Sequence, residues 1–279
     1  MESTISMKKN NQFIAFVDLD GTLLKDDKTI SEHNKKVIEE FINKGNFLVL
    51  CSGRASVFVK NKANKINASD YLISDNGALV YNYKTKEIIY ENPIDHDLLV
   101  KFLNYAEKNE LAVILNCFEK QYRNELSHHK NIENIYEINN FNEKVYQIIV
   151  SANNYDKAVK LDRELEDLED FTINYKSIDL VLKKKSASGY GFDLNKKGSN
   201  KGKGIVQLLD YLKIDRKYSI AIGDHYNDIS MFAEVALKIA MDNSYDSLKK
   251  KADYITDANE EDGVAKILSE ILEIIDKET

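Results

Sequence analysis

A run of five apolar residues that ends in an acidic turn constrains this chain most. Residues 13–17 are apolar without interruption, which is typical of a strand buried on both faces within a parallel sheet. Asp18 and Asp20 follow two residues apart, so both side chains are expected to leave the strand end on the same side. Gly21 permits a tight turn after them, and Thr22 brings a hydroxyl close to both carboxylates. Neighbouring carboxylates repel each other, and a hard cation with oxygen ligands is the usual relief.

Alternating strand and helix patterns predict the fold class of the two ends of the chain. The predicted order near the N-terminus is strand, helix, strand, helix, strand, at residues 13–17, 31–45, 47–50, 56–66 and 71–73. The C-terminal part repeats it, with helices at 201–212 and 262–275 and strands at 219–222, 237–240 and 253–256. Because polar residues follow the strand ends, the pattern indicates a doubly wound sheet that binds its ligand at that edge.

The stretch between these two parts has a different pattern. Hairpin-like alternation at 79–90 precedes predicted helices at 97–107 and 155–168 and strands at 112–115, 146–150, 171–175 and 180–182. It has no acid cluster at a strand end, and His128 and His129 are expected in a loop. We therefore predict an α/β protein. Its doubly wound, Rossmann-like parallel-sheet core would comprise residues 1–82 and 186–279, with an α+β domain inserted at residues 83–185.

Charge and composition argue against several classes of function. A net charge of −7 disfavours general nucleic-acid binding, which depends on Lys and Arg neutralising phosphates. No stretch has the length of a membrane span, and residues 1–12 are too polar for a signal peptide. Cys51 and Cys117 are too few for a disulfide framework or a zinc cage, so we expect a reducing, cytoplasmic setting. The sequence leaves the oligomeric state open.

Polar residues at several predicted strand and helix ends are expected to meet at one rim of the core sheet. They are Asp18 and Asp20, Ser52, Lys201, and Asp224 with Asp228. Three or four carboxylates and a lysine suit Mg²⁺ together with a phosphate group, which the Ser52 hydroxyl and backbone N–H groups can also bind. One carboxylate can then attack phosphorus, while a second, two residues on, can protonate the leaving oxygen and later activate water.

Four short motifs resemble, in order, those of the haloacid dehalogenase-like hydrolases. They are Asp18-Leu19-Asp20-Gly21-Thr22-Leu23-Leu24, Ser52-Gly53-Arg54, Lys201-Gly202 and Gly223-Asp224-x-x-Asn227-Asp228. The similarity is greatest to the Cof-type phosphatases, which carry a C2-type cap domain between the second and third motifs, where the α+β insert lies here. Two further segments look like that subgroup, Asn76-Gly77-Ala78 and Glu261-Asp262-Gly263-Val264-Ala265. The resemblance thus covers nearly the whole chain.

By position, the resemblance implies a role for each matching residue. Asp18 would be the nucleophile and Asp20 the general acid/base. Phosphate or substrate would be bound by Ser52, Gly53, Arg54, Asn76, Lys201 and Asn227, although Arg54 and Asn76 can instead tie the strand ends together. Mg²⁺ would be held by Asp18, the backbone carbonyl of Asp20, and Asp224, with Asp228 and Asn227 as direct or outer ligands. Ser52 stands where many relatives carry threonine, and Lys201 is preferred to Lys203 because Gly202 follows it.

The resulting hypothesis is a Mg²⁺-dependent phosphatase that hydrolyses small phosphorylated metabolites, with sugar phosphates as the leading class, through an aspartyl-phosphate intermediate. Its expected partner is a small-molecule phosphate ester, with neither nucleic acid nor membrane involved. A phosphomutase of the same superfamily and a non-catalytic phosphate-binding module are the alternatives. A phospho-accepting receiver is disfavoured by the large insert and by the second acid, Asp20.

Overall fold

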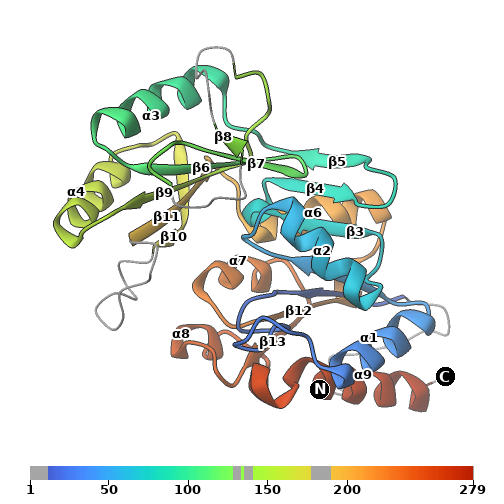
Figure 1. The fold of residues 1–279 in the computed structure, drawn as a ribbon. Coiled ribbons are helices and arrows are strands. Elements are labelled where there is room, and N and C mark those ends of the chain that lie inside the picture. The colour runs from blue at the N-terminus through green and yellow to red at the C-terminus, as the bar shows by residue number, and fades with distance from the viewer. Residues whose placement is uncertain (1–11, 128–132, 135–140, 177–189, 279) are drawn as a thin grey trace.

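Figure 1 shows the computed structural model of the chain, which describes residues 12–127, 133–134, 141–176 and 190–278. Eight strands form one sheet in the order β14-β13-β12-β1-β2-β3-β4-β5. The strands from β14 to β3 run parallel, whereas β4 and β5 add antiparallel at one edge. Their bounds are β1 Ile14–Val17, β2 Phe47–Cys51, β3 Tyr71–Ser74, β4 Leu79–Asn82, β5 Ile88–Glu91, β12 Ser219–Gly223, β13 Leu237–Met241 and β14 Tyr254–Thr256.

Side chains that alternate between the two faces explain why this sheet is buried on both sides. In β1, Ala15 and Val17 belong to one apolar cluster, and Ile14 and Phe16 belong to the other. The helices of the first cluster are α1 Glu32–Asn43, α2 Ser56–Ile66 and α9 Gly263–Glu278, and those of the second are α6 Lys201–Leu212, α7 Ile229–Phe232 and α8 Asp246–Lys249. The predicted doubly wound core is therefore confirmed.

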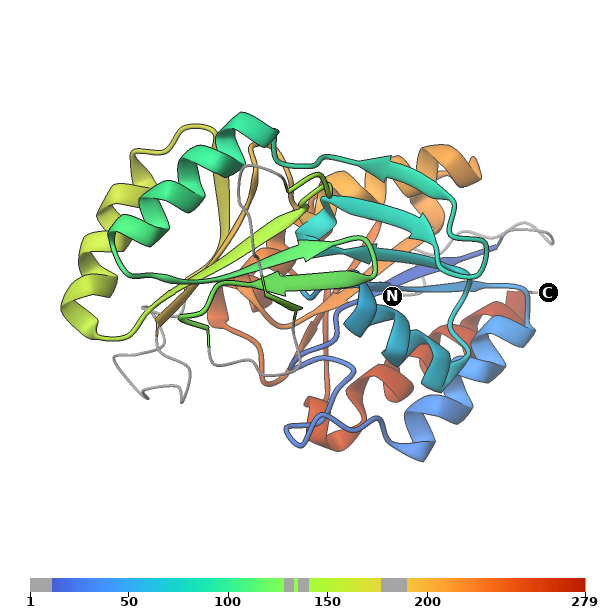
Figure 2. The ribbon, with the colours of Figure 1, turned by 45° about the horizontal axis from the view of Figure 1, so that its top comes forward.

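A second sheet of six strands, in the order β10-β11-β9-β6-β7-β8, forms the other part of the molecule. Its strands are β6 Ala112–Cys117, β7 Lys120–Arg123, β8 Glu133–Asn134, β9 Gln147–Ala152, β10 Phe171–Lys176 and β11 Tyr190–Lys196. Helices α3 His96–Lys108 and α4 Tyr155–Glu166 pack on one face, on the side away from the eight-stranded sheet (Figures 1 and 2). Apolar residues at alternate positions, such as Val113, Leu115, Phe192 and Leu194, bury that face.

Sheet membership differs in two places from the predicted division of the chain. β5 pairs with β4 and so lies in the eight-stranded sheet, past the predicted boundary at 82/83. β11 pairs with β9 and β10 and so lies in the six-stranded sheet, although it was assigned to the core. The boundary at 185/186, the predicted strand 180–182, and His128 and His129 all lie outside the described residues. In the part of the chain that the structure describes, no helix has both the length and the apolar character needed to cross a membrane.

Buried amides join the six-stranded sheet to the strand ends of the eight-stranded sheet. Asn116 donates a hydrogen bond to Asp75 Oδ1 (3.0 Å), and Asn195 donates one to the Asp75 backbone carbonyl (2.8 Å). Gln147 donates to the backbone carbonyl of Gly53 (3.1 Å). These amides lie at positions that alternate with the apolar residues facing α3 and α4. The face that these helices leave uncovered is therefore held over the predicted site.

Candidate active site

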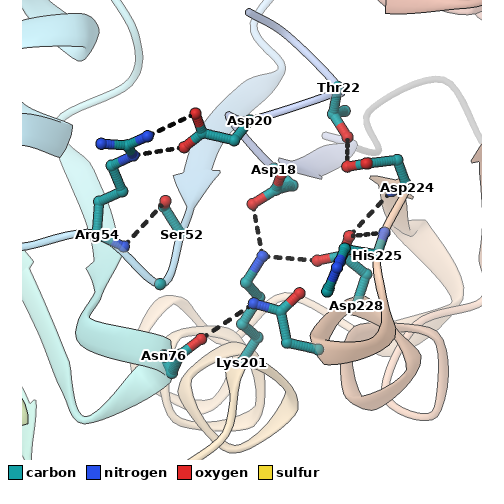
Figure 3. A network of polar contacts seen from close by, with 12 residues as sticks. Asp18, Asp20, Thr22, Ser52, Arg54, Asn76, Lys201, Asp224, His225 and Asp228 are labelled. Atoms are coloured by element: carbon teal, nitrogen blue, oxygen red, sulfur yellow. Dashed lines mark hydrogen bonds and ion pairs between the residues drawn. The ribbon is translucent and has the colours of Figure 1, made fainter. Parts of the chain in front are cut away.

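Three adjacent strands of the eight-stranded sheet end at the same edge, and a predicted site residue follows each of them. β1 pairs in parallel with both β2 and β12, so Asp18, Ser52 and Asp224 directly follow neighbouring strand ends. The backbone N–H of Asp18 donates to the Ile222 carbonyl (3.1 Å), which extends the pairing one residue beyond β1. The pattern of buried strands that end in polar residues thus produces the meeting of side chains that Figure 3 shows.

Lys201, at the start of α6, links two carboxylates at the centre of the site (Figure 3). Its Nζ donates hydrogen bonds to Asp18 Oδ1 (2.5 Å) and to Asp228 Oδ1 (2.6 Å), and all three side chains are buried. Burial disfavours the charge on Lys201, but the two carboxylates outweigh it and raise the pKa of Lys201. Burial raises the pKa of Asp18 to about 7, because one ammonium shared by two carboxylates compensates it only in part.

Asp224 adds a third carboxylate to this group. Its Oδ1 accepts a hydrogen bond from Thr22 Oγ1 (2.8 Å). Gly21 is required beside it, since its φ is +82° and a Cβ there would lie 2.3 Å from Asp224 Oδ2. Asp228 Oδ2 accepts hydrogen bonds from the backbone N–H groups of Asp224 and His225, both at 2.9 Å, and so holds the turn after β12. Burial raises the pKa of Asp224 to about 8, and the charges of Asp18 and Asp228 add to the effect.

The chemistry of this group fits a hard divalent cation. Asp18, Asp224 and Asp228 each place a carboxylate oxygen within 4.8 Å of the others. Three carboxylates against one ammonium leave two negative charges in a buried space, which is costly unless a cation or protons neutralise them. Oxygen donors are the ligands that Mg²⁺ prefers. Asp228 already accepts three hydrogen bonds, so its geometry suits holding Lys201 and the Asp224 backbone.

Asp20 lies beside this group but is paired with different cations. The Arg54 guanidinium donates two hydrogen bonds to it, from Nε (2.5 Å) and from Nη2 (2.8 Å), and Lys28 Nζ donates a third (2.8 Å). Burial alone would raise the pKa of Asp20, but the hydrogen bonds and charges of Arg54 and Lys28 lower it overall. Arg54 also stacks over the Phe58 ring, 4.5 Å from its centroid. Asp20 is therefore held as a carboxylate.

Most of the remaining predicted residues line a cavity, and one of them, Asn76, connects neighbouring loops through hydrogen bonds. Ser52, Gly53, Arg54 and Asn227 line the cavity, and Ser52 Oγ accepts the backbone N–H of Arg54 (3.2 Å). Asn76 is completely buried, and its Oδ1 accepts a hydrogen bond from the Asn227 amide (3.1 Å). Its backbone N–H donates to the Ser52 carbonyl (3.1 Å). Asn76 thus joins the loops after β3 and β12.

The cavity has a volume of about 800 Å³ and receives its wall from both sheets. His225, a variable position of the fourth motif that was expected as pocket wall or packing, lines the cavity. The lining also contains residues that no sequence motif indicated, namely Lys28, Ala55, Phe58, Ile114, Gln121, Ile149, Asp193, Asn243 and Tyr245. One sequence signal was available for Asp193. Apolar residues alternate with polar ones along β11, with Phe192 and Leu194 buried and Asp193 between them, as in a half-buried strand.

Comparisons with known proteins agree with this fold. A sequence model of the haloacid dehalogenase-like hydrolases matches residues 15–268. In Bacillus subtilis, 5-amino-6-(5-phospho-D-ribitylamino)uracil phosphatase YcsE is 28% identical over 252 residues, covering 90% of this chain and 92% of that protein. The B. subtilis phosphatase YitU, named for the same reaction, is 27% identical over 271 residues, covering 92% and 97%.

A solved structure extends the comparison to the fold. The crystal structure of a haloacid dehalogenase-like hydrolase from Bacteroides thetaiotaomicron matches with a TM-score of 0.80 and 26% identity, covering 94% of this chain and all of that one (100%). The four motifs, the two-sheet fold and these matches agree. The chain therefore belongs to the haloacid dehalogenase-like hydrolases, as a phosphatase of the Cof type.

Proposed function

We propose that this phosphatase is Mg²⁺-dependent and hydrolyses small phosphorylated metabolites, with sugar phosphates as its substrate class, through an aspartyl-phosphate on Asp18. The observation that carries the proposal is the buried group of Asp18, Lys201, Asp224 and Asp228 next to the ionised Asp20. The name of the relative YcsE supports the substrate class, since its substrate carries phosphate on a sugar-alcohol chain. A cavity of about 800 Å³ suits a metabolite-sized ligand.

In the proposed mechanism, Asp18 attacks phosphorus, and the bond between phosphorus and the leaving oxygen breaks with its electron pair on that oxygen. Asp20 gives the leaving oxygen a proton. It then takes a proton from the water that attacks the phosphoryl-aspartate, which releases phosphate and restores Asp18. Lys201 orients Asp18 through the hydrogen bond to its Oδ1, and Ser52 and the backbone N–H groups around Gly53 bind phosphoryl oxygens.

Two sets of residues prepare this chemistry. Asp18, Asp224 and the Asp20 backbone carbonyl would hold Mg²⁺, with Asp228 positioning Asp224, and the bound ion would supply positive charge against the phosphoryl oxygens. Arg54 and Lys28 hold Asp20 ionised, and both line the cavity. An entering phosphate dianion competes for these cations, which frees Asp20 to take up the proton that it later donates.

Phosphate release from a panel of sugar phosphates and other phosphorylated metabolites, with Mg²⁺ or with excess EDTA, tests the function. We expect release with Mg²⁺ and a loss of about a hundredfold or more with EDTA, restored by added Mg²⁺. Release that is insensitive to EDTA would contradict the metal dependence. Isomerised sugar phosphate without free phosphate would identify a phosphomutase, and binding without turnover would identify a phosphate-binding module.

Removing Arg54 should shift the pH dependence of kcat/KM upward. In Arg54→Ala the pKa of Asp20 rises, because the doubly hydrogen-bonded guanidinium that lowers it is lost. Asp20 must be deprotonated to activate water, so a raised pKa moves the acidic limb of the profile to higher pH. Asp20 must be protonated to donate to the leaving oxygen, so the alkaline limb moves to higher pH as well. Arg216→Ala, which removes an arginine that precedes β12, is the matched control. A raised KM with an unmoved profile would assign Arg54 to substrate binding instead.

We also propose a cytoplasmic location, which the two cysteines support. Cys51 and Cys117 are both free thiols and both buried. Burial raises the pKa of each thiol, so neither is activated as a nucleophile. Two reduced, inert cysteines support the proposed cytoplasmic location.

A further inference from the structure

A row of three side chains crosses the uncovered face of the six-stranded sheet. Ile114 in β6 is directly opposite Ile149 in β9, and Ile149 is directly opposite Asp193 in β11. Side chains directly opposite one another in a sheet point to the same face. The neighbouring residues Val113, Val150 and Phe192 belong to the cluster under α3 and α4, so this row points the other way. All three residues of the row line the cavity that contains Asp18 and Asp20.

Asp193 is the charged member of this row, and its sign decides what it can contact. A carboxylate only accepts hydrogen bonds and repels a phosphate dianion, so Asp193 cannot hold the phosphoryl group. Arg54 lies close enough to lower the pKa of Asp193, but burial dominates and raises it to about 7. Gln147 donates a long hydrogen bond to it, at 3.4 Å, and the Asn76 side chain also donates one. Asp193 is therefore a partly buried acceptor that faces the cavity, where a ligand can supply a further donor.

The two isoleucines place an apolar surface next to this acceptor. Ile114 and Ile149 have no hydrogen-bonding side-chain atoms, and they lie between β7 and Asp193 along the row. The predicted phosphate-binding residues all lie in segments that follow strands of the eight-stranded sheet or at the start of α6, and the nucleophile directly follows β1. The row is accordingly a part of the cavity wall that is separate from these residues and can contact the group attached to the phosphate.

We infer that Ile114, Ile149 and Asp193 form the leaving-group subsite of this enzyme, in which the Asp193 carboxylate accepts a hydrogen bond from a substrate hydroxyl or N–H while the isoleucines contact its C–H groups. This inference rests on the proposed phosphatase function. The substrate would then have a leaving group that carries hydrogen-bond donors, as in phosphorylated sugars, sugar alcohols and amino sugars. Leaving groups that carry a second phosphate or a carboxylate are disfavoured, because Asp193 repels them.

Kinetics with two kinds of ester test the inference. Ribose 5-phosphate, ribitol 5-phosphate and glucosamine 6-phosphate carry donors on the leaving group, whereas p-nitrophenyl phosphate carries none. In Asp193→Ala and Asp193→Asn, kcat/KM for the best donor-bearing ester, divided by that for p-nitrophenyl phosphate, should fall about 10- to 100-fold. Asp193→Glu should restore part of the ratio. Asp156→Asn removes the same charge at an exposed position of α4 and should leave the ratio unchanged.

Binding separates this inference from the proposed function. In the Asp18→Asn background, calorimetry with Mg²⁺ measures the affinity for each ester without turnover, with and without Asp193→Ala. If Asp193→Ala weakens the binding of the donor-bearing esters alone, the subsite is supported even if wild type hydrolyses no ester. Absence of hydrolysis would contradict only the phosphatase mechanism. Equal losses for both kinds of ester, or a wild type that prefers donor-free esters, would overturn the assignment of Asp193.

Discussion

Replacing Asp18 by asparagine is expected to lower kcat by about a thousandfold or more, because a side-chain amide cannot act as the nucleophile toward phosphorus. The variant should still fold. The asparagine oxygen can accept the hydrogen bond that Lys201 now donates to Asp18, and one charge is removed from a buried group that carries an excess of negative charge. Phosphate release with saturating Mg²⁺ measures the loss of activity, and thermal unfolding measures the fold.

Detection of the covalent phosphoryl-enzyme tests the role of Asp18 as nucleophile directly. Intact-mass spectrometry of acid-quenched reactions should find a phosphoryl group on the wild-type chain and none on Asp18→Asn. Asp210→Asn, an exposed aspartate on α6, provides the same change of charge away from the site and should keep wild-type kcat. An Asp18→Asn enzyme with more than about a tenth of wild-type kcat would refute the assignment of Asp18 as nucleophile.

Replacing Lys201 by methionine is expected to reduce both stability and activity. Lys201 is 1% exposed and donates hydrogen bonds to two buried carboxylates, so its loss leaves both charges without their cation. Breaking a buried ion pair in this way costs about 3–5 kcal/mol in the free energy of unfolding. The pKa of Asp18, already raised by burial, should rise further, so that the nucleophile is protonated near neutral pH. Urea denaturation and kcat/KM with Mg²⁺ measure the two effects.

Two further variants distinguish the ion pairs from a general effect of losing a lysine. Lys203 lies two residues along α6 and is exposed, so Lys203→Met should change neither stability nor activity beyond experimental error. This comparison also tests the choice of Lys201 over Lys203. Adding Asp228→Asn to Lys201→Met removes one of the two buried carboxylates that have lost their cation. The double variant should recover part of the free energy of unfolding without recovering activity. A Lys201→Met enzyme within about 1 kcal/mol of wild type would show that the ion pairs contribute little.

The prediction from sequence succeeded where neighbouring residues carry the information. The apolar run of β1, its acidic turn and the cap that Ser31 provides for α1 are local patterns, and the structure has them at the predicted places. The sequence also predicted that Asp18, Ser52, Lys201 and Asp224 lie at one edge of the sheet, and they do, because parallel strands end at the same edge. It failed at β5 and β11, since sheet membership depends on pairing partners rather than on the strand's own residues.

By itself, then, the sequence determined the doubly wound core, the insert and the residues at the strand ends, since periodicity and turn chemistry are short-range properties. Only the tertiary structure decided which charges pair. Arg54 reaches Asp20 across 34 positions of sequence, and Gln147 reaches Asp193 across 46, contacts that no local pattern specifies. The same holds for the leaving-group wall. Asp193 joins the site because antiparallel register places it beside Ile149, on the face of the second sheet that lines the cavity, and partial burial there gives its charge an effect that a fully exposed carboxylate would not have.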